Sequence, residues 1–402
     1  MRRGLLYAGT ETGLYVSFDD GGSWRPFQRN LPVVPISDLA VAGSDLVVAT
    51  QGRAFWILDD LTPLRLWNEG LPSEAVHLFP PRPTIRLSTD GDQGDGEPLP
   101  NRGENAPRGV VIDYFLKEKP KDDQEVSIQI LSGETVLRSF SSKKKPGSED
   151  EHPADADDAK RDKPLEVSAG LNRFVWDLRM LEPVLISPRY TFGDTPPFGA
   201  RVAPGTYTVR LKVGTRVLEE KAEVRPLSTL KVSAAELKEQ FDLLAALEGD
   251  LSAAHETVRS IQDAKSQIKG IVERADKIGK GGKLSELAKP LTEKLSAVED
   301  KLFNPNLKAD EDSLLYTPRL DFQFAALAGV VASADARPTA AALKRYAELR
   351  KQLDDILQDL RRVLDQELAA FNKAVRDQDV PPVVFIPREK HDPFESRVLK
   401  TP

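Results

Sequence analysis

The feature that most constrains the fold is an eight-residue turn-forming segment, SFDDGGSW, from Ser17 to Trp24. It has the form Ser-x-Asp-x-Gly-x-x-Trp and lies between segments with strand-like alternation. In such a turn the Ser17 and Asp19 side chains can bond nearby backbone amides. Gly21 permits a positive φ, and Trp24 can pin the hairpin to its neighbour. The segment therefore predicts a structural turn between β-strands, with an architectural rather than catalytic role.

A repeat supports this interpretation independently of the motif. The segment from Leu6 to Asp20 recurs forty positions later, from Leu46 to Asp60. Five positions match at this offset: Leu6 with Leu46, Thr10 with Thr50, Tyr15 with Phe55, Asp19 with Asp59, and Asp20 with Asp60. The second copy lacks the motif, because Ile57, Leu61 and Leu64 replace Ser17, Gly21 and Trp24. Two unrelated strand pairs are the alternative, but five matches beside a turn motif favour a repeat.

A period of forty fits the blades of a β-propeller, which repeat at roughly 40–45 residues. Residues 1–67 are therefore predicted to form about one and a half blades of a partial β-propeller. Because a propeller closes with roughly 4–8 blades, we expect the chain to be the C-terminal part of a longer protein. The remaining blades would be its first partners.

Composition excludes several classes of function. The 402 residues suffice for two to four domains, and the net charge of −7 comes from interspersed charges that give no nucleic-acid footprint. The absence of cysteine excludes disulfides, thiolate metal sites and a cysteine nucleophile. No apolar run is long enough for a membrane span. The start of the chain, from Met1 to Gly4, lacks the apolar region of a signal peptide.

The middle of the chain is predicted to form an immunoglobulin-like or fibronectin III-like β-sandwich over residues 109–227. A linker rich in Pro, Gly and Asp precedes it at residues 68–108, and a charged, disordered insertion interrupts it at residues 141–164. Its expected strands are residues 110–116, 126–130, 136–140, 172–177 and 205–213.

At residue 233 the apolar period changes from strand-like to helical, which predicts an antiparallel helical bundle over residues 228–378. Ser233 and Glu236 form a capping box, and a glycine-rich turn after residue 278 ends the first helix. Thr317 and Pro318 are expected at the N-cap and first position of a third helix. The expected helices are residues 234–278, 284–302, 319–333 and 338–376. An extended tail is predicted for residues 379–402.

Taken in order, these parts resemble the C-terminal half of bacterial sortilin-type propeller proteins, which carry the Asp-box or BNR repeat and are often labelled glycosyl hydrolases. The Asp-box residues Ser17, Asp19, Gly21 and Trp24 are the specific part of the resemblance. Other matching runs are QGRAFWILDDL at 51–61, GENAPRG at 103–109, IDY at 112–114, GLNRFVWDL at 170–178 and PGTY at 204–207. The resemblance implies a periplasmic or secreted parent protein, without a proven reaction.

Acidic pairs at Asp19-Asp20 and Asp59-Asp60 raise the possibility of a glycosidase. Its two carboxyl groups must lie about 5–10 Å apart across a sugar. Neighbouring residues on a strand point to opposite faces, so neither pair qualifies by itself. A sialidase would also need an arginine cluster and a tyrosine nucleophile, for which only Arg53 and Tyr15 are suggestive. Structural roles are favoured for both, and no catalytic residue is assigned.

No cofactor or metal site is assigned either. The acidic run at 90–97 resembles a calcium loop, but Gly94 and Asp95 fall where a ligand and a glycine are required, which favours a flexible linker. The histidines lack ligand spacing; they are His77, His152, His255 and His391. The run GKGGK at 279–283 lacks the end of a P-loop and is expected to be a helix–helix turn.

Three hypotheses remain. In the first, the chain is a non-catalytic binding or scaffold portion of an exported propeller protein with a protein or glycan ligand. In the second, the parent is a glycoside hydrolase or sialidase-like enzyme whose active centre lies in the missing blades. In the third, the helical bundle serves assembly through self-association. Neither a nucleic-acid partner nor a membrane span is expected.

Overall fold

The computed structural model describes residues 2–68, 70–87, 105–121, 123–143, 164–186, 199–307 and 312–378, and structural statements below refer to these residues. The chain divides into two compact units. Among the described residues, the first unit contains 2–87, 105–178 and 205–227, and the second contains 179–186, 199–204 and 228–378. The named strands lie in the first unit and the long helices in the second, so the predicted order of β then α is confirmed.

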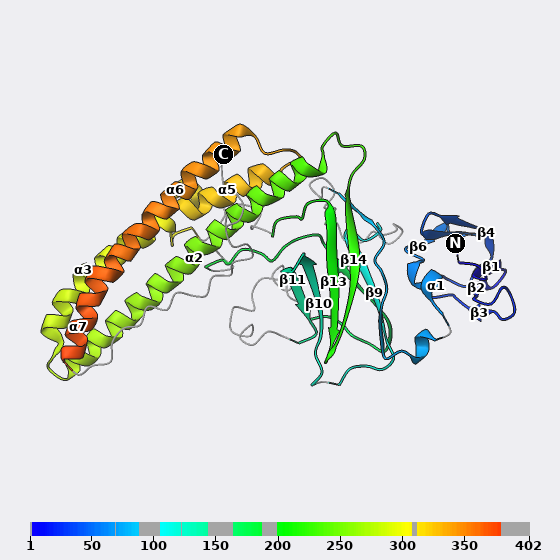
Figure 1. Ribbon diagram of the computed structural model, residues 1–402, viewed down its shortest axis with the longest axis horizontal. Coiled ribbons are helices and arrows are strands. Elements are labelled where there is room, and N and C mark those ends of the chain that lie inside the picture. The colour runs from blue at the N-terminus through cyan, green and yellow to red at the C-terminus, as the bar shows by residue number, and fades with distance from the viewer. Residues whose placement is uncertain are drawn as a thin grey trace. The chain divides into compact units, whose positions relative to one another are not determined.

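Two small antiparallel sheets begin the first unit (Figure 1). Repeat 1 is the sheet β1 (Leu6–Thr10), β2 (Gly13–Ser17) and β3 (Arg25–Pro26). Repeat 2 is the sheet β4 (Ile36–Ala42), β5 (Asp45–Thr50) and β6 (Phe55–Leu58). The two repeats share one hydrophobic cluster, whose buried members are Leu14, Leu31, Leu46, Val48 and Leu61. The repeat predicted from sequence therefore corresponds to two strand hairpins that pack on each other.

Two details of the predicted repeat were wrong. The connection between β5 and β6 has four residues, and that between β1 and β2 has two. In the observed register Tyr15, opposite Ala8, corresponds to Trp56, opposite Val48, and not to Phe55. Within residues 1–67, which were predicted to form blades of β-strands, Thr62–Leu66 instead forms the short helix α1. Proline in the first turn of α1 fits this start, because its fixed φ suits a helix and its missing N–H is not needed there.

Two larger sheets follow in the same unit. One has five strands in the order β11-β10-β13-β14-β8, and the other has three in the order β12-β9-β7. Their bounds are β7 (Val76–Leu78), β8 (Thr84–Arg86), β9 (Val110–Leu116), β10 (Val126–Ser132), β11 (Thr135–Ser141), β12 (Gly170–Trp176), β13 (Gly205–Val213) and β14 (Arg216–Pro226). Every expected strand of this region is present, whereas β7, β8 and β14 were not foreseen. Pairs are antiparallel except β8 with β14.

The strand β9 is buried on both faces, and this positions the site described below. Ile112 and Tyr114 lie on one face, and Asp113 and Phe115 lie on the other, because successive side chains alternate. Phe115 packs in a second hydrophobic cluster with Leu71 and Phe79. Asp113 therefore lies in an apolar setting that requires a partner for its charge.

The described residues contain no closed ring of sheets and no closed barrel. Each of the two repeats has three strands, whereas a propeller blade usually has four. The assignments to propeller blades and to an immunoglobulin-like sandwich therefore remain proposals.

The second unit is built on α2 (Ala234–Lys277), whose 44 residues begin at the predicted capping box of Ser233 and Glu236. Gly279, with φ +73°, ends it in the left-handed region that glycine adopts without strain. The other helices are α3 (Gly281–Leu302), α4 (Asp312–Leu315), α5 (Leu320–Ala332), α6 (Ala340–Val363) and α7 (Ala369–Asp377), with a π-helical segment, Leu364–Leu368, between the last two. The start of α5 was mispredicted, because Arg319, not Thr317, is its N-cap residue.

Long-range contacts define how the helices of this unit pack (Figure 1). Both α5 and α3 run antiparallel to α2, with α5 beside its first half and α3 beside its second half. Gln240 donates to the Val331 carbonyl at one end (2.8 Å), and Gln262 donates to Glu299 further along (2.8 Å). The continuous rod of α6 and α7 packs against α3, α5 and α2. The expected antiparallel helical arrangement is present.

Candidate functional site

The predicted Asp-box forms a closed hydrogen-bonded turn after β2. The hydroxyl of Ser17 donates to Asp19 Oδ1 (2.7 Å) and accepts from the amide of Gly21 (2.9 Å). The Asp19 carboxylate also accepts from the Ser23 amide (2.8 Å) and the Ser23 hydroxyl (2.6 Å). Gly21 has φ +91°, in the region that favours glycine. Ser23, which the sequence motif leaves unspecified, thus contributes two of the contacts.

The carboxylate of Asp19 is committed to this turn. Its hydrogen bonds from Ser23 and then Ser17 lower the pKa of Asp19 to about 2, since they stabilise the charged form. Trp24 lies beside Gly21 and keeps 42% of its surface exposed. The arrangement holds the ends of a β-turn together and leaves Asp19 unsuited to accept or release a proton near neutral pH.

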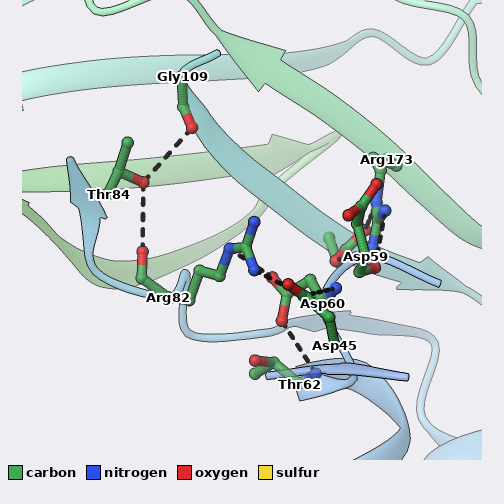
Figure 2. A network of polar contacts seen from close by, with 9 residues as sticks. Asp45, Asp59, Asp60, Thr62, Arg82, Thr84, Gly109 and Arg173 are labelled. Carbon is green, nitrogen blue, oxygen red and sulfur yellow. Dashed lines mark hydrogen bonds and ion pairs between the residues drawn. The ribbon is translucent and has the colours of Figure 1, made fainter. Parts of the chain in front are cut away.

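A network of charged groups lies where repeat 2 contacts the larger sheets (Figure 2). Asp45 Oδ1 accepts from Arg82 Nη1 (2.9 Å) and from the amide of Asp60 (2.9 Å). The other acid, Asp60, is 5% exposed; it accepts from the Thr62 amide (3.0 Å), and its Oδ2 lies 3.8 Å from Arg82 Nε. Arg82 thus bridges two carboxylates of repeat 2. These two contacts compensate the charge of the buried Asp60 carboxylate and of the half-buried Asp45 carboxylate.

A second arginine extends the network into the sheet that contains β9. Arg173 on β12 forms a two-pronged ion pair with Asp113 on β9, through Nε–Oδ1 (2.8 Å) and Nη2–Oδ2 (3.0 Å). Its Nη1 also donates to the backbone carbonyl of Asp59 (3.4 Å). Burial alone would lower the pKa of Arg173, but the hydrogen bonds and charge of Asp113 outweigh it and raise that pKa. The network ties the Asp59-Asp60 corner to the larger sheets.

The acidic pairs considered as glycosidase groups therefore have structural contacts. Asp19 and Asp60 are each held by several donors, and the Asp59 carbonyl accepts from Arg173. Arg53 and Tyr15 belong to different repeats; Arg53 is exposed in the connection before β6, where its carbonyl accepts from Trp56. The structure does not bring Arg53 into the network of Figure 2.

Buried polar side chains of α2 form a separate cluster in the second unit. His255 Nε2 lies 3.1 Å from Asp321 Oδ2 on α5, and both side chains are fully buried. The other ring nitrogen of His255 lies 3.2 Å from the Val184 carbonyl and 3.2 Å from the Ile186 amide. With both ring nitrogens engaged by protein groups, His255 joins three segments of the unit.

Glu248 lies two turns earlier on α2 and anchors the backbone at Ala200. Its carboxyl accepts from the amide of Ala200 (2.9 Å), and burial raises its pKa to about 8. Sequence reasoning did not single out Glu248 or the pairing of His255. The available signal was that both polar residues lie on or beside the apolar stripe of α2, where a buried polar group requires a partner.

Other sequence candidates are accounted for as follows. His77 contacts Glu74 at the surface (2.8 Å). The turn expected at 279–283 was predicted too long, because the connection from α2 to α3 covers only residues 278–280 and Gly281 already begins α3. His152, His391 and the acidic run at 90–97 lie outside the described residues. In the part of the chain that the structure describes, no group of three or more His, Cys, Asp or Glu residues is placed to hold a metal ion. Within the same residues, no helix has the length and apolar character needed to cross a membrane.

Comparison with known proteins gives no assignment. No family model, curated protein or solved structure matches the chain.

Proposed function

We propose that the chain is a non-catalytic binding or scaffold portion of an exported, sortilin-like Asp-box propeller protein that engages a protein or a glycan. The observation that carries the proposal is the turn of Ser17, Asp19 and Gly21, whose contacts have the form that the motif predicts. It follows the first of two equivalent hairpins that pack on each other. Together they support a propeller-type repeat as a rigid platform for binding.

The carboxylates nearest to this platform support a structural role. Hydrolysis of a glycoside requires one carboxyl group that can release a proton and another that can act as a base or nucleophile. The low pKa of Asp19 makes it a poor proton donor, and Asp60 is engaged by Thr62 and Arg82. These acids stabilise turns and corners of the chain. The periplasm or the extracellular medium is the proposed location of the parent protein.

The alternative proposal is a fragment of a glycoside hydrolase or sialidase-like enzyme, with its active centre in further blades. One experiment tests whether this chain itself binds or cleaves glycans, whereas activity in the full-length parent that this chain lacks would favour the alternative. The purified protein is applied to an array of immobilised glycans and, separately, incubated with a panel of aryl glycosides. Saturable glycan binding without aryl release supports the binding proposal.

If the chain releases the aryl group, a matched pair of variants tests whether its own acids are responsible. Asp20→Asn alters an exposed acid of the turn, and Asp60→Asn alters a buried one. Aryl release that either substitution abolishes in a folded protein would contradict the non-catalytic proposal. If the chain neither binds glycans nor releases the aryl group, a protein is the remaining ligand class. Direct titration with candidate proteins then tests it.

A further inference from the structure

The strand register assigns each side chain of the two repeats to a face. Paired residues of an antiparallel sheet lie on the same face, and successive residues alternate. We name the two sides of repeat 1 face A and face B. Face A carries Tyr7, Gly9, Leu14 and Val16. Face B carries Leu6, Ala8, Tyr15 and Ser17.

The same faces can be identified in repeat 2 by structural correspondence. The strand β1 corresponds to β5 at an offset of forty, and β2 corresponds to β6 at an offset of forty-one, since Leu6 pairs with Ser17 and Leu46 pairs with Leu58. Face A of repeat 2 therefore carries Val47, Ala49, Phe55 and Ile57. Face B of repeat 2 carries Leu46, Val48, Trp56 and Leu58.

The repeats pack through unlike faces. Repeat 1 contributes Tyr7 and Leu14, from face A, to the shared hydrophobic cluster. Repeat 2 contributes face B to the same cluster, through Leu46, Val48, Trp56 and Leu58. The contact is close at Gly9, where an added Cβ would lie 2.5 Å from Ile36 Cγ2. Face A against face B is a head-to-tail contact, so face B of repeat 1 and face A of repeat 2 lie outside it.

Among the described residues, face A of repeat 2 is apolar and exposed, whereas face B of repeat 1 is only partly open, because Ser17 is buried and Ala8 and Tyr15 are half-buried. On face A of repeat 2, Phe55 is 74% exposed and Ile57 is 60% exposed. Their counterparts in repeat 1, Leu14 and Val16, are only 5% and 3% exposed. On face B of repeat 1, Leu6 is 38% exposed, whereas its counterpart Leu46 is 1% exposed. Leu6, Phe55 and Ile57 are therefore exposed at positions whose counterparts in the other repeat are buried.

We propose that face A of repeat 2 docks on face B of repeat 1 in a second copy of the chain. The existing contact between the repeats supplies the argument, since it already joins the same two kinds of face. Because a head-to-tail contact does not satisfy both copies at once, it extends into a ring or an open filament. This inference rests on the proposed scaffold function and names a partner for it, a second copy of the chain in the place that a further blade would otherwise take.

Complementary variants test this mode of assembly. Phe55→Glu with Ile57→Glu places charge on face A of repeat 2, and Leu6→Glu with Ala8→Glu places charge on face B of repeat 1. Val33→Glu is the matched control, because Val33 is 75% exposed and lies outside both faces. Each protein is examined by sedimentation velocity, after near-UV circular dichroism has shown a native signal.

The wild type and Val33→Glu are expected to self-associate, and each double variant is expected to be monomeric. An equimolar mixture of the two double variants should form a dimer of twice the monomer mass, since each retains one intact face. A wild type that stays monomeric at its highest soluble concentration would overturn the proposal. So would association that neither double variant weakens. Glycan binding by a monomeric wild type would refute this inference while leaving the proposed binding function in place.

Discussion

The ion pair of Asp113 and Arg173 provides a quantitative test of how the larger sheets are stabilised. Asp113 is 4% exposed and Arg173 is about one-third exposed, with both prongs within 3.0 Å. Breaking a buried pair by removing one partner costs about 3–5 kcal/mol, because the other charge stays buried. Since water can reach the Arg173 side, Arg173→Leu should lower the free energy of unfolding by about 2–3 kcal/mol.

A double-mutant cycle separates the interaction from the loss of packing. Asp113→Val leaves an arginine that can turn toward solvent, so we expect a cost of about 1–2 kcal/mol. The double variant with both substitutions should be within about 1 kcal/mol of the wild type, since an apolar pair replaces the charges. The cycle should therefore give a coupling energy of about 2 kcal/mol.

Urea unfolding followed by tryptophan fluorescence measures these differences, because Trp176, on the same strand as Arg173, is fully buried. The matched control is Arg210→Leu, which breaks the more exposed pair of Arg210 with Glu219 (2.6 Å). This change should cost less than about 1 kcal/mol. A cost for Arg173→Leu as small as that of the control, with additive effects in the cycle, would refute the argument from burial.

Three further changes have defined outcomes. Tyr7→Phe removes a buried hydroxyl without a hydrogen-bond partner, and urea unfolding should show a gain of up to about 1 kcal/mol; a clear loss would reveal a partner. Asp19→Asn should remove a stabilisation that wild-type Asp19 gives above its unfolded pKa near 4 and loses as pH falls through about 2. Thermal melts of both proteins between those pH values should converge on acidification, and parallel curves would contradict this. Glu248, with its pKa raised to about 8, should make the wild type less stable as pH rises from about 4.5 toward 8. Glu248→Gln should remove that slope in melts monitored by helical circular dichroism, and an unchanged slope would assign it to another group.

The strongest local patterns predicted local structure well. Residues 205–213 alternate cleanly and form β13 with those bounds, and the capping box at Ser233 marks the start of α2. Both signals act within a few residues of chain. The signal at Thr317 failed because its carbonyl accepts from Asn304 (3.1 Å), and the helix begins two residues later, after Arg319. A contact from outside the helix therefore displaced its expected cap.

The candidate site divides in the same way. The Asp-box turn lies within eight residues, so its contacts could be anticipated from the motif. The pair of Asp113 and Arg173 is separated by 60 residues, and His255 and Asp321 by 66. Such pairs depend on strand register or helix packing, which composition and periodicity do not determine. The unlike-face contact of the repeats also required the observed register, because a shift of one residue exchanges the faces.

The most direct test of the account is a disulfide between the two repeats. The chain has no cysteine, so Gly9→Cys with Ile36→Cys introduces a single possible pair. A Cβ at Gly9 would lie 2.9 Å from Ile36 Cβ, and a small backbone shift gives the spacing of about 3.5–4.5 Å that a disulfide requires. Gly9→Cys with Ile57→Cys is the control, since Ile57 lies on the uncovered face of repeat 2. Mass spectrometry after mild oxidation should find an intramolecular crosslink in the first variant and none in the control. Failure of the first pair to crosslink, or equal crosslinking in the control, would contradict the head-to-tail packing of the repeats.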